Sequence, residues 1–226
     1  RVGIDGRLTN KYFVGTALAE LPFFLLAHLY CKVGGAHPAD GYSKPYTVVV
    51  SVAALFYLLV GLFFIAQTAQ TFEVGSIAVF IGLATITFGT NLFYYTVGEP
   101  GMSHIYSFAV IAAFVFFSRK FFISNDKGLL PVLGFVLGFI ALIRPVNLLV
   151  IAAIPFVAGS MDVLKNAVRS VWKNLAWSLS AIVLFTATVM VQLIIYRIST
   201  EHWLVYSYAE EGFNFFDPQM LDMLFN

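Results

Sequence analysis

"YTVVVSVAALFYLLVGLFFIAQTAQ", residues Tyr46–Gln70, contains no acidic or basic side chain. As an α-helix rising 1.5 Å per residue, this run is longer than the roughly 30 Å thickness of the hydrocarbon core of a bilayer. The stretch Val74–Gly98 is also free of charged side chains and has a similar length. Two such runs predict membrane-spanning helices, so the sequence indicates an integral membrane protein with an all-α fold.

The composition of the whole chain agrees with this class. Of 226 residues, 60% are hydrophobic and 11% are charged, whereas soluble domains carry about 25% charged residues. The net charge of +1 gives no reason to expect a nucleic-acid partner. The single cysteine, Cys31, excludes an internal disulfide and a cysteine metal cluster.

The remaining segments predict a polytopic transmembrane helical bundle with a short helical hairpin and an interfacial helix. Spans are expected at 46–70, 74–97, 103–118 and 175–197, and the hairpin at 129–158. The apolar segment Tyr12–Tyr30 is interrupted by Glu20 and Pro22. It can be read as a span that enters from the inner side, but the interruptions favour a helix lying along the outer surface.

Basic residues orient these spans, because cytoplasmic loops are enriched in lysine and arginine. Two loops carry the basic clusters: Arg119, Lys120 and Lys127 in one, and Lys165, Arg169 and Lys173 in the other. With both loops inside, the turn "GEPGMSH" and the hairpin turn "RPVN" face the extracytoplasmic side. The expected organisation is therefore a first extracytoplasmic loop (1–45), a bundle (46–198) and the start of another extracytoplasmic loop (199–226).

Arg144 lies in the middle of the predicted hairpin, between two apolar legs. Pro145 disfavours helix at Arg144, and each leg is too short to cross a membrane comfortably as an α-helix. The chain is expected to turn there and to point Arg144 into a cavity, since irregular backbone at that depth needs protein or water around it. A guanidinium suits phosphate or carboxylate, so Arg144 is a candidate ligand for a lipid phosphate. The alternative is an arginine that extends to the lipid headgroups.

Glu99 and His104 form a second candidate site, five residues apart across a Gly-Pro break. A carboxylate and an imidazole together can bind a divalent ion or move a proton. The alternative is an acid that complements a helix N-terminus and a histidine hydrogen-bonded within the bundle. The two residues do not complete a metal ligand set, although a divalent metal is compatible with them.

Three stretches carry a resemblance to a known family. They are "GRLTNKYFVGTALAELPFFLLAH" (6–28), "YYTVGEPGMSHIYSFAVIAAFVFF" (94–117) and "GFVLGFIALIRPVNLLVIAAIPF" (134–156). Their order resembles the GT-C-fold glycosyltransferases that use polyprenyl-phosphate sugars. The branch to which they are most similar is that of the protein O-mannosyltransferases and lipid A aminoarabinose transferases.

The resemblance implies transfer of a sugar from a polyprenyl-phosphate donor to a lipid, glycan or protein acceptor. It implies an enzyme in the bacterial inner membrane, with its site on the extracytoplasmic face. Glu99 and His104 would be the catalytic residues, and Arg144 would contact the donor phosphate. Lys11 and Tyr12 match a basic-aromatic turn facing the lipid carrier. The family's principal catalytic acid would lie upstream of Arg1, so the chain is expected to be a fragment that is inactive by itself.

The aromatic and acidic tail adds two candidates for substrate binding, Tyr208 and Glu211. Tyrosine rings can stack on a sugar and acids can contact an acceptor, but an interfacial aromatic belt or a solvated loop explains them equally. Two other functions stay open: a transporter or flippase for an anionic lipid, and a non-catalytic membrane subunit.

Overall fold

The computed structural model describes residues 2–4, 7–10 and 12–205. It confirms the predicted all-α class: in this part of the chain, the only strands are two three-residue segments. Four helices are long and apolar enough to cross a membrane, namely Gly15–Gly34, Lys44–Gln70, Ser103–Ser124 and Leu175–Thr200. The described chain is therefore that of an integral membrane protein.

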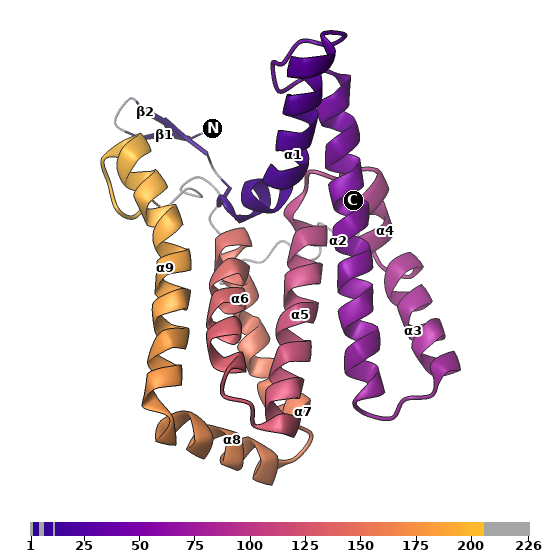
Figure 1. Ribbon diagram of the computed structural model, residues 1–226, viewed down its shortest axis with the longest axis vertical. Coiled ribbons are helices and arrows are strands. Elements are labelled where there is room, and N and C mark those ends of the chain that lie inside the picture. The colour runs from indigo at the N-terminus through magenta and orange to yellow at the C-terminus, as the bar shows by residue number, and fades with distance from the viewer. Residues whose placement is uncertain (1, 5–6, 11, 206–226) are drawn as a thin grey trace, which may run out of the picture. The chain divides into compact units, whose positions relative to one another are not determined.

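The elements follow one another with short connections (Figure 1). In chain order they are β1 (Val2–Ile4), β2 (Arg7–Thr9), α1 (Gly15–Gly34), α2 (Lys44–Gln70), α3 (Ser76–Phe88), α4 (Leu92–Val97), α5 (Ser103–Ser124), α6 (Leu129–Ile143), the 3₁₀ helix η1 (Pro145–Ala153), α7 (Ile154–Ala158), α8 (Met161–Lys173) and α9 (Leu175–Thr200).

The described chain forms two compact units, residues 13–192 and a smaller unit of 2–12 with 193–205. In the smaller unit, β1 and β2 pair antiparallel, where the sequence predicted only a loop. Arg7 Nη2 lies 2.5 Å from Glu201 Oε1, and both side chains are exposed. An exposed ion pair of this kind contributes little to stability.

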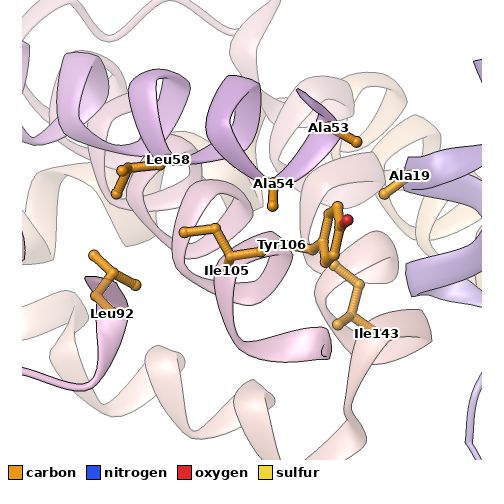
Figure 2. Packing of buried hydrophobic residues seen from close by; sticks show 8 residues of the cluster. All are labelled: Ala19, Ala53, Ala54, Leu58, Leu92, Ile105, Tyr106 and Ile143. Atoms are coloured by element: carbon orange, nitrogen blue, oxygen red, sulfur yellow. The ribbon is translucent and has the colours of Figure 1, made fainter. Parts of the chain in front are cut away.

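The core of the larger unit lies between α2 and α5, with α1, α4 and the end of α6 around it (Figure 2). Small residues allow the close approach: Ala53 and Ala54 are fully buried, and a Cβ on Gly61 would overlap the Phe108 ring. Tyr106 of α5 is also fully buried, and its ring packs edge-on against that of Tyr57 of α2, with centroids 5.0 Å apart.

Two glycines one helical turn apart bring α6 against α9. A Cβ on Gly134 would overlap the Ala181 carbonyl, and a Cβ on Gly138 would lie 2.8 Å from the Thr188 Cβ. Small residues at this four-residue spacing are the usual means of close helix packing in membranes. The pair Gly134 and Gly138 therefore fixes α9 alongside the hairpin.

The predicted position of 12–30 along the outer surface stays a prediction, although α1 packs lengthwise on α2 instead of lying across the other helices. Helix α1 runs antiparallel along the first half of α2 (Figure 1). Near one end of the pair, Tyr57 donates to the Ala19 carbonyl oxygen at 3.1 Å. Further along, His28 Nδ1 lies 2.6 Å from the Tyr46 hydroxyl. Contacts on both sides of Pro22 therefore hold α1 against α2, and the helix continues through the proline.

Two predicted spans differ in their details. The span 74–97 is divided into α3 and α4 by a break at 89–91, where the Thr90 hydroxyl accepts from the backbone N–H of Leu92 at 3.2 Å. The third span continues through the basic residues to Ser124 because Arg119 finds partners inside the bundle.

The hairpin is present, but its return leg is largely a nine-residue 3₁₀ helix. A 3₁₀ helix rises about 2.0 Å per residue and is seldom longer than four residues. With this rise, η1 and α7 together extend about 26 Å, close to the thickness of a hydrocarbon core. The return leg therefore reaches further than its residue count predicted.

Candidate functional site

Three chain segments meet at the end of the larger unit that carries Arg144. They are the turn between α4 and α5, the end of α6 and the start of α1. Arg144 has an extended backbone, with φ −154° and ψ 116°, so α6 ends there. Gly15 lies directly against the backbone of Leu142 and Ile143, where any Cβ would clash. The close contact fixes α1 beside the tip of the hairpin.

The Arg144 guanidinium faces His104. Nη1 of Arg144 lies 3.5 Å from Nδ1 of His104, and Arg144 is half-buried. The imidazole ring is stacked on the Tyr95 ring, with centroids 4.0 Å apart and an interplanar angle of 20°. Since a guanidinium only donates hydrogen bonds, Nδ1 in this contact is the acceptor and the proton of a neutral ring is on Nε2.

Glu99 is in the same site. Its Oε1 accepts a hydrogen bond from the Tyr94 hydroxyl at 3.1 Å. Glu99 and Arg144 are both electrostatic neighbours of His104. The structure therefore brings together the three residues that the sequence placed on one side of the membrane: a carboxylate, an imidazole and a guanidinium.

Asn147 anchors the tip of the hairpin, a role that the sequence analysis did not assign. Its Nδ2 donates to the buried Ser107 Oγ at 2.8 Å, and its backbone N–H donates to the Arg144 carbonyl oxygen at 2.9 Å. These bonds connect the turn directly to α5. They hold the Arg144 backbone while its side chain extends toward His104.

Glu20 is the site residue that the sequence analysis used only to orient its helix. One of its carboxyl oxygens is buried and has no hydrogen-bond partner among the described residues. The same oxygen lies 4.0 Å from where a Cβ on Gly101 would be. Nearby, the Tyr106 hydroxyl donates to the Pro100 carbonyl oxygen at 2.9 Å. The signal was available, since an ionisable residue inside an apolar segment is by default a candidate for function.

The structure does not test the other predicted binding residues. Tyr12 belongs to the smaller unit, where its side chain is exposed and its N–H donates to Asn10 Oδ1 at 3.0 Å. Lys11, Tyr208 and Glu211 lie outside the described residues. The substrate contacts expected of these four residues stay predictions.

The described residues contain no group of three histidine, cysteine, aspartate or glutamate side chains arranged to hold a metal ion. Glu99 and His104 alone supply two ligands, fewer than the sites of divalent ions usually have. Arg144 has the donors to bind an anion, and the Glu99 and Glu20 carboxylates can accept a proton.

The helices define an integral membrane protein, and Arg144, His104 and Glu99 form a polar cluster at one end of its larger unit. The chain matches no protein-family model, no curated protein and no solved structure.

Proposed function

We propose that the protein transfers a sugar from a polyprenyl-phosphate donor to a hydroxyl acceptor on a lipid, glycan or protein. The observation that carries the proposal is the Arg144–His104 contact at the tip of an apolar hairpin, with Glu99 in the same cluster. The site lies on the extracytoplasmic face of a bacterial inner membrane if the basic loops are cytoplasmic.

The donor's chemistry fits the surroundings of Arg144. The residues just before it on α6, Ala141 to Ile143, are buried and apolar, whereas the guanidinium is half-buried beside polar groups. A polyprenyl chain dissolves in the bilayer and ends in a phosphate at the membrane boundary. Arg144 can donate two parallel hydrogen bonds to that phosphate, and such a contact is strongest where water is excluded.

The reaction is a single displacement at the anomeric carbon. The acceptor oxygen forms a bond to this carbon while the bond between the carbon and the phosphate oxygen breaks. The electron pair of the broken bond stays on the polyprenyl phosphate, where Arg144 stabilises the growing negative charge. The acceptor proton passes to the Glu99 carboxylate. His104 acts as a positioning residue that keeps the guanidinium in place.

The first experiment measures transfer of labelled sugar from a polyprenyl-phosphate donor by the intact protein in vesicles. Arg144→Ala should raise the activation free energy by about 2–4 kcal/mol, the scale of a lost oxyanion donor, and so lower turnover. Arg144→Lys should restore only part of it, because an ammonium cannot make the two-pronged contact. Lys127→Ala, which removes an exposed cation from the turn between α5 and α6, is the matched control and should retain full turnover.

Glu99→Gln separates proton transfer from donor binding. It should lower turnover by roughly 100-fold or more while leaving the affinity for the donor unchanged. Wild-type turnover by a folded Arg144→Ala protein would exclude the phosphate contact. Donor binding without any transfer by the wild-type protein would instead favour transport of an anionic lipid.

A further inference from the structure

A large cavity lies toward the opposite end of the larger unit, away from Arg144. Its volume is about 600 Å³, within the roughly 300–1,000 Å³ range of small-molecule sites. Five α-helices and η1 line it, and the helices contribute, for example, Phe114 of α5, Leu133 of α6, Ile154 of α7, Ala167 of α8 and Ile182 of α9. Its wall is almost entirely hydrocarbon, so its occupant must also be apolar there.

Helix α8 lines one side of this cavity and has two distinct faces. Its apolar face consists of Leu164, Ala167, Val168 and Val171, all of which line the cavity. Its other side carries three exposed cations, Lys165, Arg169 and Lys173, against one acid, Asp162. A helix with this pattern typically lies in the membrane interface with its cations toward anionic headgroups.

Ser118 is the one polar side chain among the described residues that line the cavity. It is only 2% exposed, and its hydroxyl has no hydrogen-bond partner among the described residues. Helical serines often bond the carbonyl four residues earlier, and a buried hydroxyl without a partner is unfavourable. The hydroxyl is therefore available to an acceptor inside the cavity.

We propose that the cavity binds one acyl chain of an anionic diacyl phospholipid. The chain fills the hydrocarbon-lined volume, its ester carbonyl accepts a hydrogen bond from Ser118, and the headgroup lies against Lys165 and Arg169. Val168 and Ile182 in the cavity wall are 48% and 59% exposed, so the chain can enter from the bilayer beside α8 and α9. This site is separate from the donor site and does not depend on sugar transfer.

The binding test uses phosphatidylglycerol with a pyrene group at the end of one chain. Trp172 and Trp177 belong to α8 and α9, two of the helices that line the cavity, and serve as fluorescence donors. The purified protein is placed in phosphatidylcholine nanodiscs, and energy transfer is followed as the labelled lipid is added. Pyrene-phosphatidylglycerol should saturate the signal at a lower mole fraction than pyrene-phosphatidylcholine does.

Removing the cations tests the headgroup contact. Lys165→Gln/Arg169→Gln should weaken phosphatidylglycerol binding by about 10- to 30-fold, because each cation near a membrane surface contributes to anionic-lipid attraction. The matched control, Lys32→Gln/Lys44→Gln, also removes two exposed cations, which lie in the last turn of α1 and at the start of α2 and do not line the cavity. It should leave binding unchanged.

Two further variants test the chain and ester contacts. Ser118→Ala should weaken the ester-linked lipid by about 2- to 10-fold, the range of one hydrogen bond, and leave an ether-linked analogue unaffected. Ala167→Leu reduces the cavity volume and should weaken both lipids equally. Ser118→Ala should keep the unfolding temperature of the wild type. Its lipid-binding result can then be interpreted even if Ala167→Leu does not fold.

Three results would overturn the proposal. Equal binding of phosphatidylglycerol and phosphatidylcholine would exclude headgroup selection. An equal loss in the control double variant would attribute binding to overall charge. Competition by glycerophosphoglycerol, which has the headgroup without acyl chains, at the same concentration as the lipid would show that the cavity has no part in binding.

Discussion

Glu20 has one buried carboxyl oxygen to which no described residue donates a hydrogen bond, close to Gly101 and to the Tyr106 side chain. Removing a polar group from water without giving it a partner costs free energy. Nothing in the packing of α1 needs this charge, because the neighbouring Ala19 is buried in an apolar cluster. A carboxyl retained at such a cost next to the turn between α4 and α5 is a candidate for a role in the reaction.

Glu20→Met should therefore stabilise the protein while impairing the proposed activity. Methionine has a similar length and favours helix, so the free energy of unfolding should rise by about 1 kcal/mol. Denaturant titration in detergent measures the change. Glu99→Met is the control, because Glu99 accepts a hydrogen bond from Tyr94 and its replacement removes a contact. A loss of stability in Glu20→Met would show that its carboxyl has a partner.

At the scale of elements, close helix contacts depend on single glycines. Gly134 is in contact with the backbone of Ala181, so Gly134→Ala must separate α6 from α9 or distort one of them. We expect it to destabilise the protein by about 1–3 kcal/mol, the usual cost of overpacking. Gly82→Ala in α3 is the matched control, because nothing lies within 4 Å of its added Cβ.

The Gly82→Ala control should instead stabilise α3 by about 0.5–1 kcal/mol, since alanine favours helix over glycine. Thermal unfolding of both variants in the same detergent measures the difference. If Gly134→Ala is as stable as Gly82→Ala, the two helices do not depend on the close contact.

Arg119 joins the ends of three elements. Its Nη1 donates to the carbonyl oxygens of Ala158 and Val157 at 3.0 and 3.3 Å, and its Nε donates to Thr71 Oγ1 at 3.2 Å. Its guanidinium also lies over the Phe72 ring, 4.0 Å from the centroid. This side chain therefore holds the end of α7 and the turn after α2 against α5.

Arg119→Met should cost about 2 kcal/mol of stability, because it removes charged hydrogen bonds from half-buried carbonyl groups. Lys120→Met, at the exposed neighbouring position, should change stability by less than about 0.5 kcal/mol. Comparison of the two midpoints of unfolding checks the prediction. Equal midpoints would make Arg119 a surface charge like its neighbour.

The sequence predicted the helices well where the cause is local. An uncharged run as long as a membrane is thick has few alternatives to a spanning helix, and Tyr46–Gln70 is such a run. The break at 89–91 and the 3₁₀ geometry of η1 could not be read this way, because they depend on packing between helices. The spacing of Gly134 and Gly138 can be read from the sequence. The sequence does not show that α9 is the helix that packs against them.

The candidate site was partly predictable for the same reason. Arg144 and His104 both lie next to chain breaks on one side of the membrane, and this placed them near each other. Glu20 lies far from both in sequence, and the lengthwise pairing of α1 with α2 brings it to Gly101 in the turn between α4 and α5. The anchor formed by Asn147 and Ser107 likewise requires the tip of the hairpin to meet α5.

At the scale of the larger unit, the two basic clusters lie at one end and the Arg144 cluster at the other (Figure 1). Cysteine labelling tests this topology in a Cys31→Ser background, since Cys31 is the chain's single cysteine. Lys127→Cys and Lys173→Cys should react with an impermeant maleimide only from the cytoplasmic side. Met102→Cys and Val146→Cys, both exposed, should react only from outside. Labelling of Lys127→Cys and Val146→Cys from the same side would contradict the topology.

The long 3₁₀ helix η1 runs from the end of the larger unit that carries Arg144 toward the opposite end. Converting η1, which has nine residues, to an α-helix would shorten the leg by about 4.5 Å, given the rises of 2.0 and 1.5 Å per residue. One end is held by Asn147 on Ser107, and the other by Arg119 on the carbonyls of Val157 and Ala158. The leg is thus held at both ends against α5, to which both Ser107 and Arg119 belong, so any change in its helix type would have to move one of these two contacts.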